Sequence, residues 1–143
     1  MAAETVLLRY VHKNAQMGCL TIPQVLRLTE NQRLQALLRR QLEEYRQLTR
    51  ESEACLRRLG RRVSPPPTLS AALSKSMLQL KTLTNRSSSH LAQLMIQGST
   101  MGTIQMTRRL HRYPGNAASE AARLGQSLLK TEEANIQQLK QFL

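Results

Sequence analysis

The sequence contains no Asp and no Trp, and its aromatic residues are three Tyr and one Phe. No acidic side chain lies between Glu53 and Glu120, whereas about ten of the 21 Lys and Arg residues do. Four-helix bundles of this length often bind a pair of metal ions through carboxylates from every helix. One of the four helices expected here, at about residues 89–113, lies inside this gap and offers no carboxylate. A di-metal centre is therefore largely excluded.

Long apolar runs are also missing. No run approaches the roughly 18 residues of a membrane-spanning helix, so we expect no membrane span. The first residues, Met1–Glu4, lack the basic and apolar regions of a signal peptide, which favours a cytoplasmic protein.

Cys19 and Cys55 would lie about 22 Å apart along a helical hairpin that turns near Thr29, too far for a disulfide. Both thiols are therefore expected to be reduced.

The residues that are present favour an all-α protein. Leu, Ala, Gln and Arg are good helix formers, and a chain of 143 residues is one domain by length. Helical periodicity predicts four long helices within a single domain, 1–143, at about 3–28, 30–59, 89–113 and 117–142. Pro23 should kink the first helix, a capping box of Thr29 and Gln32 should start the second, and Gly60 should end it. Asn116 is the expected N-cap of the fourth helix.

The linker between the second and third helices, 60–88, is longer than a simple up-down bundle needs. Its sequence predicts a short polyproline spacer at Ser64–Thr68 and a short amphipathic helix at about 69–84. Such a segment is long enough to travel the length of the bundle. We therefore favour a long crossover, in which the second and third helices run parallel.

Two sequence segments carry a resemblance to a known superfamily. The segments are Tyr10–Gly18 and Leu83–Gly102, in which Met17-Gly18 is echoed by Met101-Gly102. Together with the two hairpins and the crossover, they resemble uncharacterised bacterial proteins of the ferritin-like superfamily, some of them from spore-forming bacteria. The resemblance implies a ferritin-like antiparallel four-helix bundle but no established activity.

The ligands of metal-bearing ferritin-like proteins do not match this sequence. Those proteins use a Glu-x-x-His motif on the second and fourth helices. Here Gln47 follows Glu44, and Asn135 follows Glu132, at the position of the histidine. We therefore expect no metal and no other cofactor. The paired acids are interpreted as solvated ion-pair partners, for example of Arg39 and Arg40, and comprise Glu43, Glu44, Glu132 and Glu133.

Polar residues at helix positions that face the core form the first candidate site. They are Asn14, Gln41, Gln105 and Asn135. They could line a pocket for a polar ligand, or they could be buried amides that bond to one another and fix the helix register. Gly98 and Gly102, with Gly18, could similarly mark a cavity or close packing between helices.

Two basic clusters form the second candidate site, at one pole of a bundle with a long crossover. They are Arg57, Arg58, Arg61 and Arg62 of the second helix and Arg108, Arg109 and Arg112 of the third. Arg9 and Lys13 would join them, and Arg61 and Arg109 should face solvent. The pole could serve solvation and the helix dipoles, or bind a polyanion or an acidic protein weakly and in a salt-sensitive manner. No motif for sequence-specific nucleic-acid recognition accompanies it.

The sequence therefore supports two functional hypotheses. The leading one is a non-enzymatic structural or interaction protein, with a homodimer as one mode of assembly. The alternative is a degenerate ferritin-like enzyme or small-ligand-binding protein that uses the polar core positions.

Overall fold

The computed structural model describes residues 2–65 and 83–143, and this part of the chain is all-helical. Its elements are α1 (Ala3–Leu28), α2 (Gln32–Arg58), α4 (Ser88–Arg112), α5 (Glu120–Leu139) and the 3-10 turn η1 (Lys140–Phe142). The all-α prediction is confirmed, and the four long helices lie within a few residues of their predicted ranges. Of the short helix predicted at about 69–84, only Leu83 and Thr84 are described, and neither is helical.

Side-chain caps set where the helices begin, and two predicted caps are wrong. Asn31, not Thr29, caps α2, because its side chain accepts from the Leu34 amide at 3.0 Å. Thr29 instead accepts from the Asn31 amide at 3.2 Å, which shapes the turn. Likewise Ser119 caps α5, while Asn116 accepts from the Ala118 amide within the preceding turn.

Gly60 ends α2 as predicted. Its φ of 70° lies in the left-handed region, which favours glycine. The Gly60 amide donates to the Arg57 carbonyl, and the Arg61 amide donates to the Leu56 carbonyl. This is the Schellman pattern, which satisfies carbonyls that have no partner in the last turn. In α1, by contrast, the helix continues through Pro23 to Leu28.

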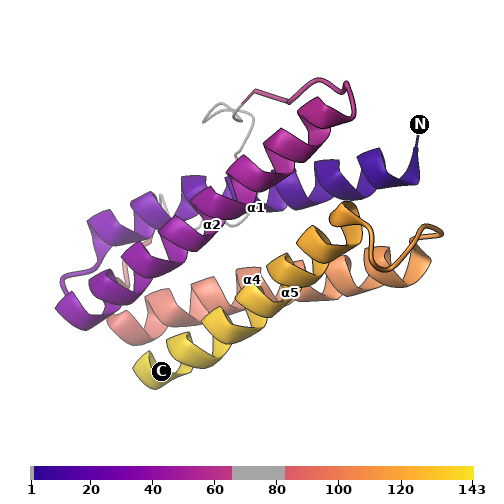
Figure 1. The fold of residues 1–143 in the computed structure, drawn as a ribbon. Coiled ribbons are helices and arrows are strands. Elements are labelled where there is room, and N and C mark those ends of the chain that lie inside the picture. Colours follow the sequence, from indigo (N-terminus) through magenta and orange to yellow (C-terminus); the bar gives the residue numbers. More distant parts are fainter. Residues whose placement is uncertain (1, 66–82) are drawn as a thin grey trace.

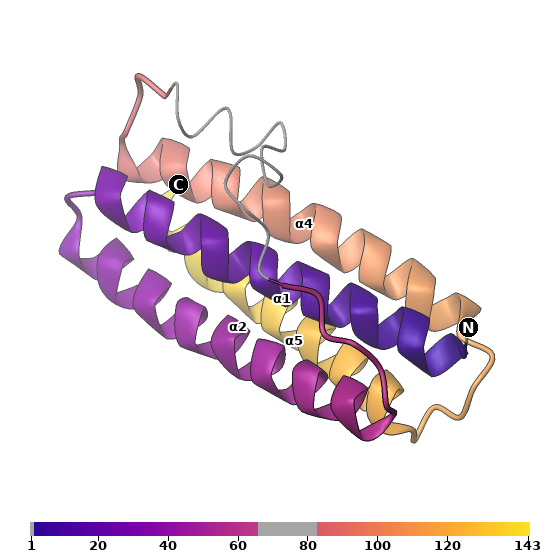
Figure 2. The same cartoon turned by 90° about the horizontal axis from the view of Figure 1, so that it is seen from above.

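The helices form two antiparallel hairpins, α1–α2 and α4–α5, that pack face to face (Figures 1 and 2). Arg58, in the last turn of α2, pairs with Glu120 at the start of α5. Tyr10 of α1 bonds to Gln105 near the end of α4. At the opposite end of the bundle, Arg33 donates to Gln141 at 2.9 Å. Helices α2 and α4 therefore run parallel, as predicted from the long linker.

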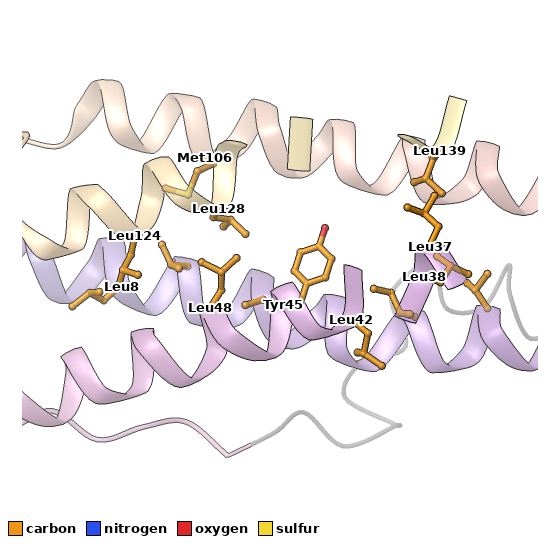
Figure 3. Close-up of a cluster of buried hydrophobic side chains, with 14 of the residues drawn as sticks. Leu8, Leu37, Leu38, Leu42, Tyr45, Leu48, Met106, Leu124, Leu128 and Leu139 are labelled. Atoms are coloured by element: carbon orange, nitrogen blue, oxygen red, sulfur yellow. The ribbon is translucent and has the colours of Figure 1, made fainter. Parts of the chain in front are cut away.

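The core is built mainly from leucines of α1, α2 and α5. Tyr45 lies in its centre, with leucines on both sides along the bundle, as Figure 3 shows. A Cβ at Gly18 would lie 2.6 Å from Cγ of Tyr45, so glycine at this position lets α1 approach the ring closely. The predicted close packing between helices is therefore present at Gly18.

The two cysteines are not joined in a disulfide, as expected from their separation along the hairpin. Cys19 and Cys55 are free, and burial raises the pKa of both thiols. None of the helices in the described ranges contains a stretch long and apolar enough to span a membrane.

Candidate functional site

Glu132 is buried in the centre of the bundle, with a relative exposure of 4%. The interpretation of this residue as a solvated ion-pair partner is wrong. It lies on the buried stripe of α5, four residues after Leu128 and seven before Leu139, and both leucines are fully buried. Among the described residues Glu132 forms no ion pair. Glu43, in contrast, is exposed and pairs with Arg46 and Arg50.

Hydroxyl groups from two other helices face the Glu132 carboxylate. Burial raises the pKa of Glu132 to about 7, although hydrogen bonding from Ser99 of α4 and Tyr45 of α2 opposes the rise. The Tyr45 hydroxyl also accepts from Nδ2 of Asn135 at 3.4 Å. Oε2 of Glu132 and Oδ1 of Asn135 are buried without a hydrogen-bond partner in the described structure. The centre of the bundle is therefore polar and incompletely satisfied.

Gly102 of α4 makes room for this polar centre. A Cβ at Gly102 would lie 3.2 Å from Nδ2 of Asn14 and 3.3 Å from Oε1 of Glu132. The Asn14 amide and the Glu132 carboxylate are thus neighbours over the bare backbone of α4. We call the residues that meet here the polar cluster: Asn14, Tyr45, Ser99, Glu132 and Asn135.

The structure brings together two of the four predicted polar core residues, Asn14 and Asn135. Gln41 is also buried, at 1% exposure, and lies one helical turn before Tyr45 on α2. Gln105 departs from the prediction, because it is exposed and accepts from the Tyr10 hydroxyl at 2.8 Å. The next residue, Met106, takes the buried position of that turn, since one residue rotates a helix by about 100°.

Two adjoining pockets of about 450 and 400 Å³ lie between α1 and α4. They share Val6, Gln105 and Arg109. We call them together the α1–α4 groove. Its cationic lining residues are Arg9, Lys13, Arg108, Arg109 and Arg112, and apolar side chains such as Val6, Leu7 and Met17 lie between them. Within the described residues, neither pocket is lined by an acidic side chain.

Tyr10 connects this groove with the polar cluster. The Arg109 guanidinium lies over the Tyr10 ring, 4.1 Å from its centroid. Burial raises the pKa of Tyr10, and the negative charge of Glu132 adds to the rise while Arg109 opposes it. Asn14 is the second connection, because it lines the smaller pocket and also neighbours Glu132. The basic groove and the buried carboxylate are therefore adjacent.

In the structure, the two arginine clusters of the predicted basic pole have different surroundings. All of its arginines are exposed, including Arg61 and Arg109 as predicted. However, Arg57 and Arg58 pair with Glu53 and Glu120, which neutralises part of the α2 cluster. The α4 cluster lines the groove instead. Arg9 and Lys13 join the α4 cluster there, as expected.

One partly buried pair was not predicted from the sequence. Nε2 of His12, on α1, lies 3.0 Å from Oε1 of Glu53 on α2. The two residues are 41 positions apart, so no local motif signals the contact. In the described ranges, no three His, Cys, Asp or Glu side chains are grouped so that they could hold a metal ion.

The chain matches no family model, no curated protein and no solved structure with which it was compared. The ferritin-like resemblance accordingly stays a prediction.

Proposed function

We propose that the protein is a non-enzymatic interaction protein whose α1–α4 groove binds an acidic amphipathic helix of a partner protein. The charge of the groove carries this proposal. Five cationic side chains surround it, and no described acid lines it. An acidic partner would gain electrostatic attraction on approach and ion pairs at the rim.

Apolar surface on both helices favours a protein partner over a nucleic acid. Val6 of α1 and Met101 and Ile104 of α4 are each more than 40% exposed. Met101 and Ile104 lie on the same stripe of α4 as Gln105 and Arg108, which line the groove. An amphipathic helix can cover such apolar groups while its acids meet the arginines.

Nucleic acids need a different surface. Proteins that bind single strands stack bases on free aromatic rings. Two aromatic rings line the groove. The ring of Tyr10 is already covered by Arg109, and Tyr113 is half-buried, with its ring against Gly115 and its hydroxyl bonded to Ser119. A second copy of the chain is also disfavoured as the occupant, because each copy carries a net charge of +12.

The dimensions suggest the length of the partner helix. The groove extends along α1 from Ala3 to Met17, which corresponds to about 21 Å of helix. A partner helix of about four turns would fill it. We propose that a ferritin-like ancestry would explain the four-helix bundle but not its function, and that recognition of the partner helix depends on this groove.

The test uses a synthetic peptide of about 14 residues with Asp on one face and Leu on the other. Its binding is followed by fluorescence anisotropy at low and at raised NaCl. We expect affinity to fall as salt rises, because the screening length is only about 10 Å at 0.1 M. Arg112→Glu should weaken binding by up to about fivefold, because an exposed charge pair contributes at most about 1 kcal/mol.

Arg39→Glu is the matched control. Arg39 is also an exposed helical arginine, but it lies near the start of α2, at the opposite end of the bundle. It should change affinity much less than Arg112→Glu. Equal losses of peptide affinity in the two variants would show that the peptide is attracted by the net charge alone. Tighter binding of single-stranded RNA than of the peptide would overturn the choice of an acidic helix as the partner.

A further inference from the structure

The polar cluster lies directly behind the floor of the α1–α4 groove. Asn14 lines the smaller pocket, and its Nδ2 atom and Oε1 of Glu132 both lie within 3.3 Å of the position of a Cβ on Gly102. Tyr10 also lines this pocket and responds electrostatically to Glu132. A charge that enters the groove is therefore separated from the buried carboxylate by only one layer of side chains.

The described groups that face Glu132 come from three helices. They are the Tyr45 hydroxyl on α2, the Ser99 hydroxyl on α4, and Tyr10 and Asn14 on α1. On its own helix, Asn135 reaches the same Tyr45 hydroxyl. The cations of the groove, among them Arg9, Lys13 and Arg109, lie beyond Tyr10 and Asn14. An ionised Glu132 is thus stabilised directly by neutral hydroxyls alone, and the groove cations lie in the next layer of side chains.

We propose that Glu132 takes up a proton when an acidic partner occupies the α1–α4 groove. This inference rests on the proposed function. Partner carboxylates neutralise the groove cations and add negative charge near the cluster, and both effects disfavour the ionised form of Glu132. Because linkage is reciprocal, protonation of Glu132 strengthens binding of the partner by the same factor. Recognition is then tighter on the acidic side of neutrality.

The expected effect is of measurable size. For scale, one uncompensated charge at a separation of about 12 Å, with an effective dielectric constant of about 20, would raise a carboxyl pKa by about one unit. The free protein titrates Glu132 near neutral pH, since its pKa is about 7. Binding at pH 7 should then take up roughly 0.4 of a proton, and affinity should be about fivefold higher at pH 6 than at pH 8.

Calorimetry with the Asp/Leu peptide tests the proposal. Titrations at pH 7 in two buffers of different ionisation enthalpy give the number of protons taken up, and titrations at pH 6 and pH 8 give the affinities. Glu132→Gln should bind the peptide with less proton uptake and a weaker pH dependence than the wild type. Every histidine is retained in this variant, so histidine protonation cancels in the comparison. Glu133→Gln, at the exposed neighbouring position, should behave as the wild type does.

The outcomes separate the two proposals. If no variant binds the peptide, the proposed function fails and the proton linkage fails with it. If the wild type and Glu132→Gln bind with the same proton uptake, the proton linkage is overturned, while the proposed binding of the peptide in the groove is unaffected.

Carboxyl NMR of Glu132 in the wild type gives a second measurement that needs no substitution at this position. Its apparent pKa should rise by about one unit when saturating peptide is added, and an unchanged value would overturn the linkage.

Discussion

Replacing Glu132 with glutamine should make the protein more stable above neutral pH. The carboxyl group is buried, and its pKa in the folded protein is raised to about 7 from the ordinary value of 4.5, chiefly by desolvation. Glutamine has nearly the same shape and carries no charge. The variant therefore avoids burying an ionised group, which the wild type must do at high pH.

The size of the effect follows from the two pKa values. Between about pH 4.5 and pH 7, the folded wild type holds a proton on Glu132 that the unfolded chain has released. Its free energy of unfolding must then fall as pH rises, by about 1.4 kcal/mol per pH unit and about 3 kcal/mol in all. This contribution is fully present below pH 4.5 and is lost by the time pH passes 7. The amide of glutamine offsets part of the gain, because a donor without a partner costs about 1 kcal/mol or more.

Urea unfolding followed by circular dichroism at 222 nm, from pH 4 to pH 9, measures this difference. We expect the stability of Glu132→Gln to exceed that of the wild type by about 1–3 kcal/mol at pH 8. At pH 4 the variant should equal the wild type or fall below it by about 1 kcal/mol, the cost of the amide. The other titrating groups are the same in both proteins, so their contributions cancel in the difference. Glu133→Gln is the matched control because Glu133 is exposed on the same helix, and its difference from the wild type should not vary with pH.

A difference between the wild type and Glu132→Gln that stays constant from pH 4 to pH 9 would refute the reasoning. It would mean that Glu132 titrates alike in the folded and unfolded states. A variant that is less stable than the wild type at pH 8 would show that the ionised carboxylate makes stabilising bonds that outweigh its desolvation.

Two further predictions concern the residues around the cluster. Gly18→Ala should destabilise the protein by about 1–3 kcal/mol in urea unfolding, because the new Cβ would overlap the Tyr45 ring. Gly98→Ala, where the new Cβ meets open space, should stabilise the protein by up to about 1 kcal/mol. A change of the same sign in both variants would contradict the close packing at Gly18. Ser99→Ala should raise the apparent pKa of Glu132 in a carboxyl NMR titration, because the serine hydroxyl lowers it in the wild type, and an unchanged value would show that Ser99 does not bond to the carboxylate.

The helices could be predicted because their local signals agree with the tertiary fold. Apolar periodicity, the positive φ required at Gly60 and the length of the linker all depend on nearby residues alone. The parallel course of α2 and α4 follows from that linker length. The helix starts were predicted less well, since Thr29 and Asn31 compete as caps and only the packing of the turn decides between them.

The candidate site could be predicted only in part. Asn14, Gln41 and Asn135 were found because they interrupt apolar stripes. Glu132 was missed, although its spacing from Leu128 and Leu139 placed it on the buried stripe, because a lone acid is rarely buried. The α1–α4 groove depends on the distance between helices from different hairpins, which no local pattern encodes.

The composition of α4 explains why the groove and the polar cluster occur together. Its buried residues are Leu91, Ala92, Ser99, Gly102 and Met106, so large apolar side chains anchor the helix near its ends, and small residues occupy its middle. A small, acid-free middle leaves the Glu132 carboxylate of α5 facing bare backbone and a hydroxyl. The same lack of acids leaves the arginines of the last turns of α4 without partners on their own helix. A partner that neutralises those arginines and a proton that neutralises Glu132 therefore act on adjacent parts of the same side of α4, and each changes the electrostatic cost that the other meets.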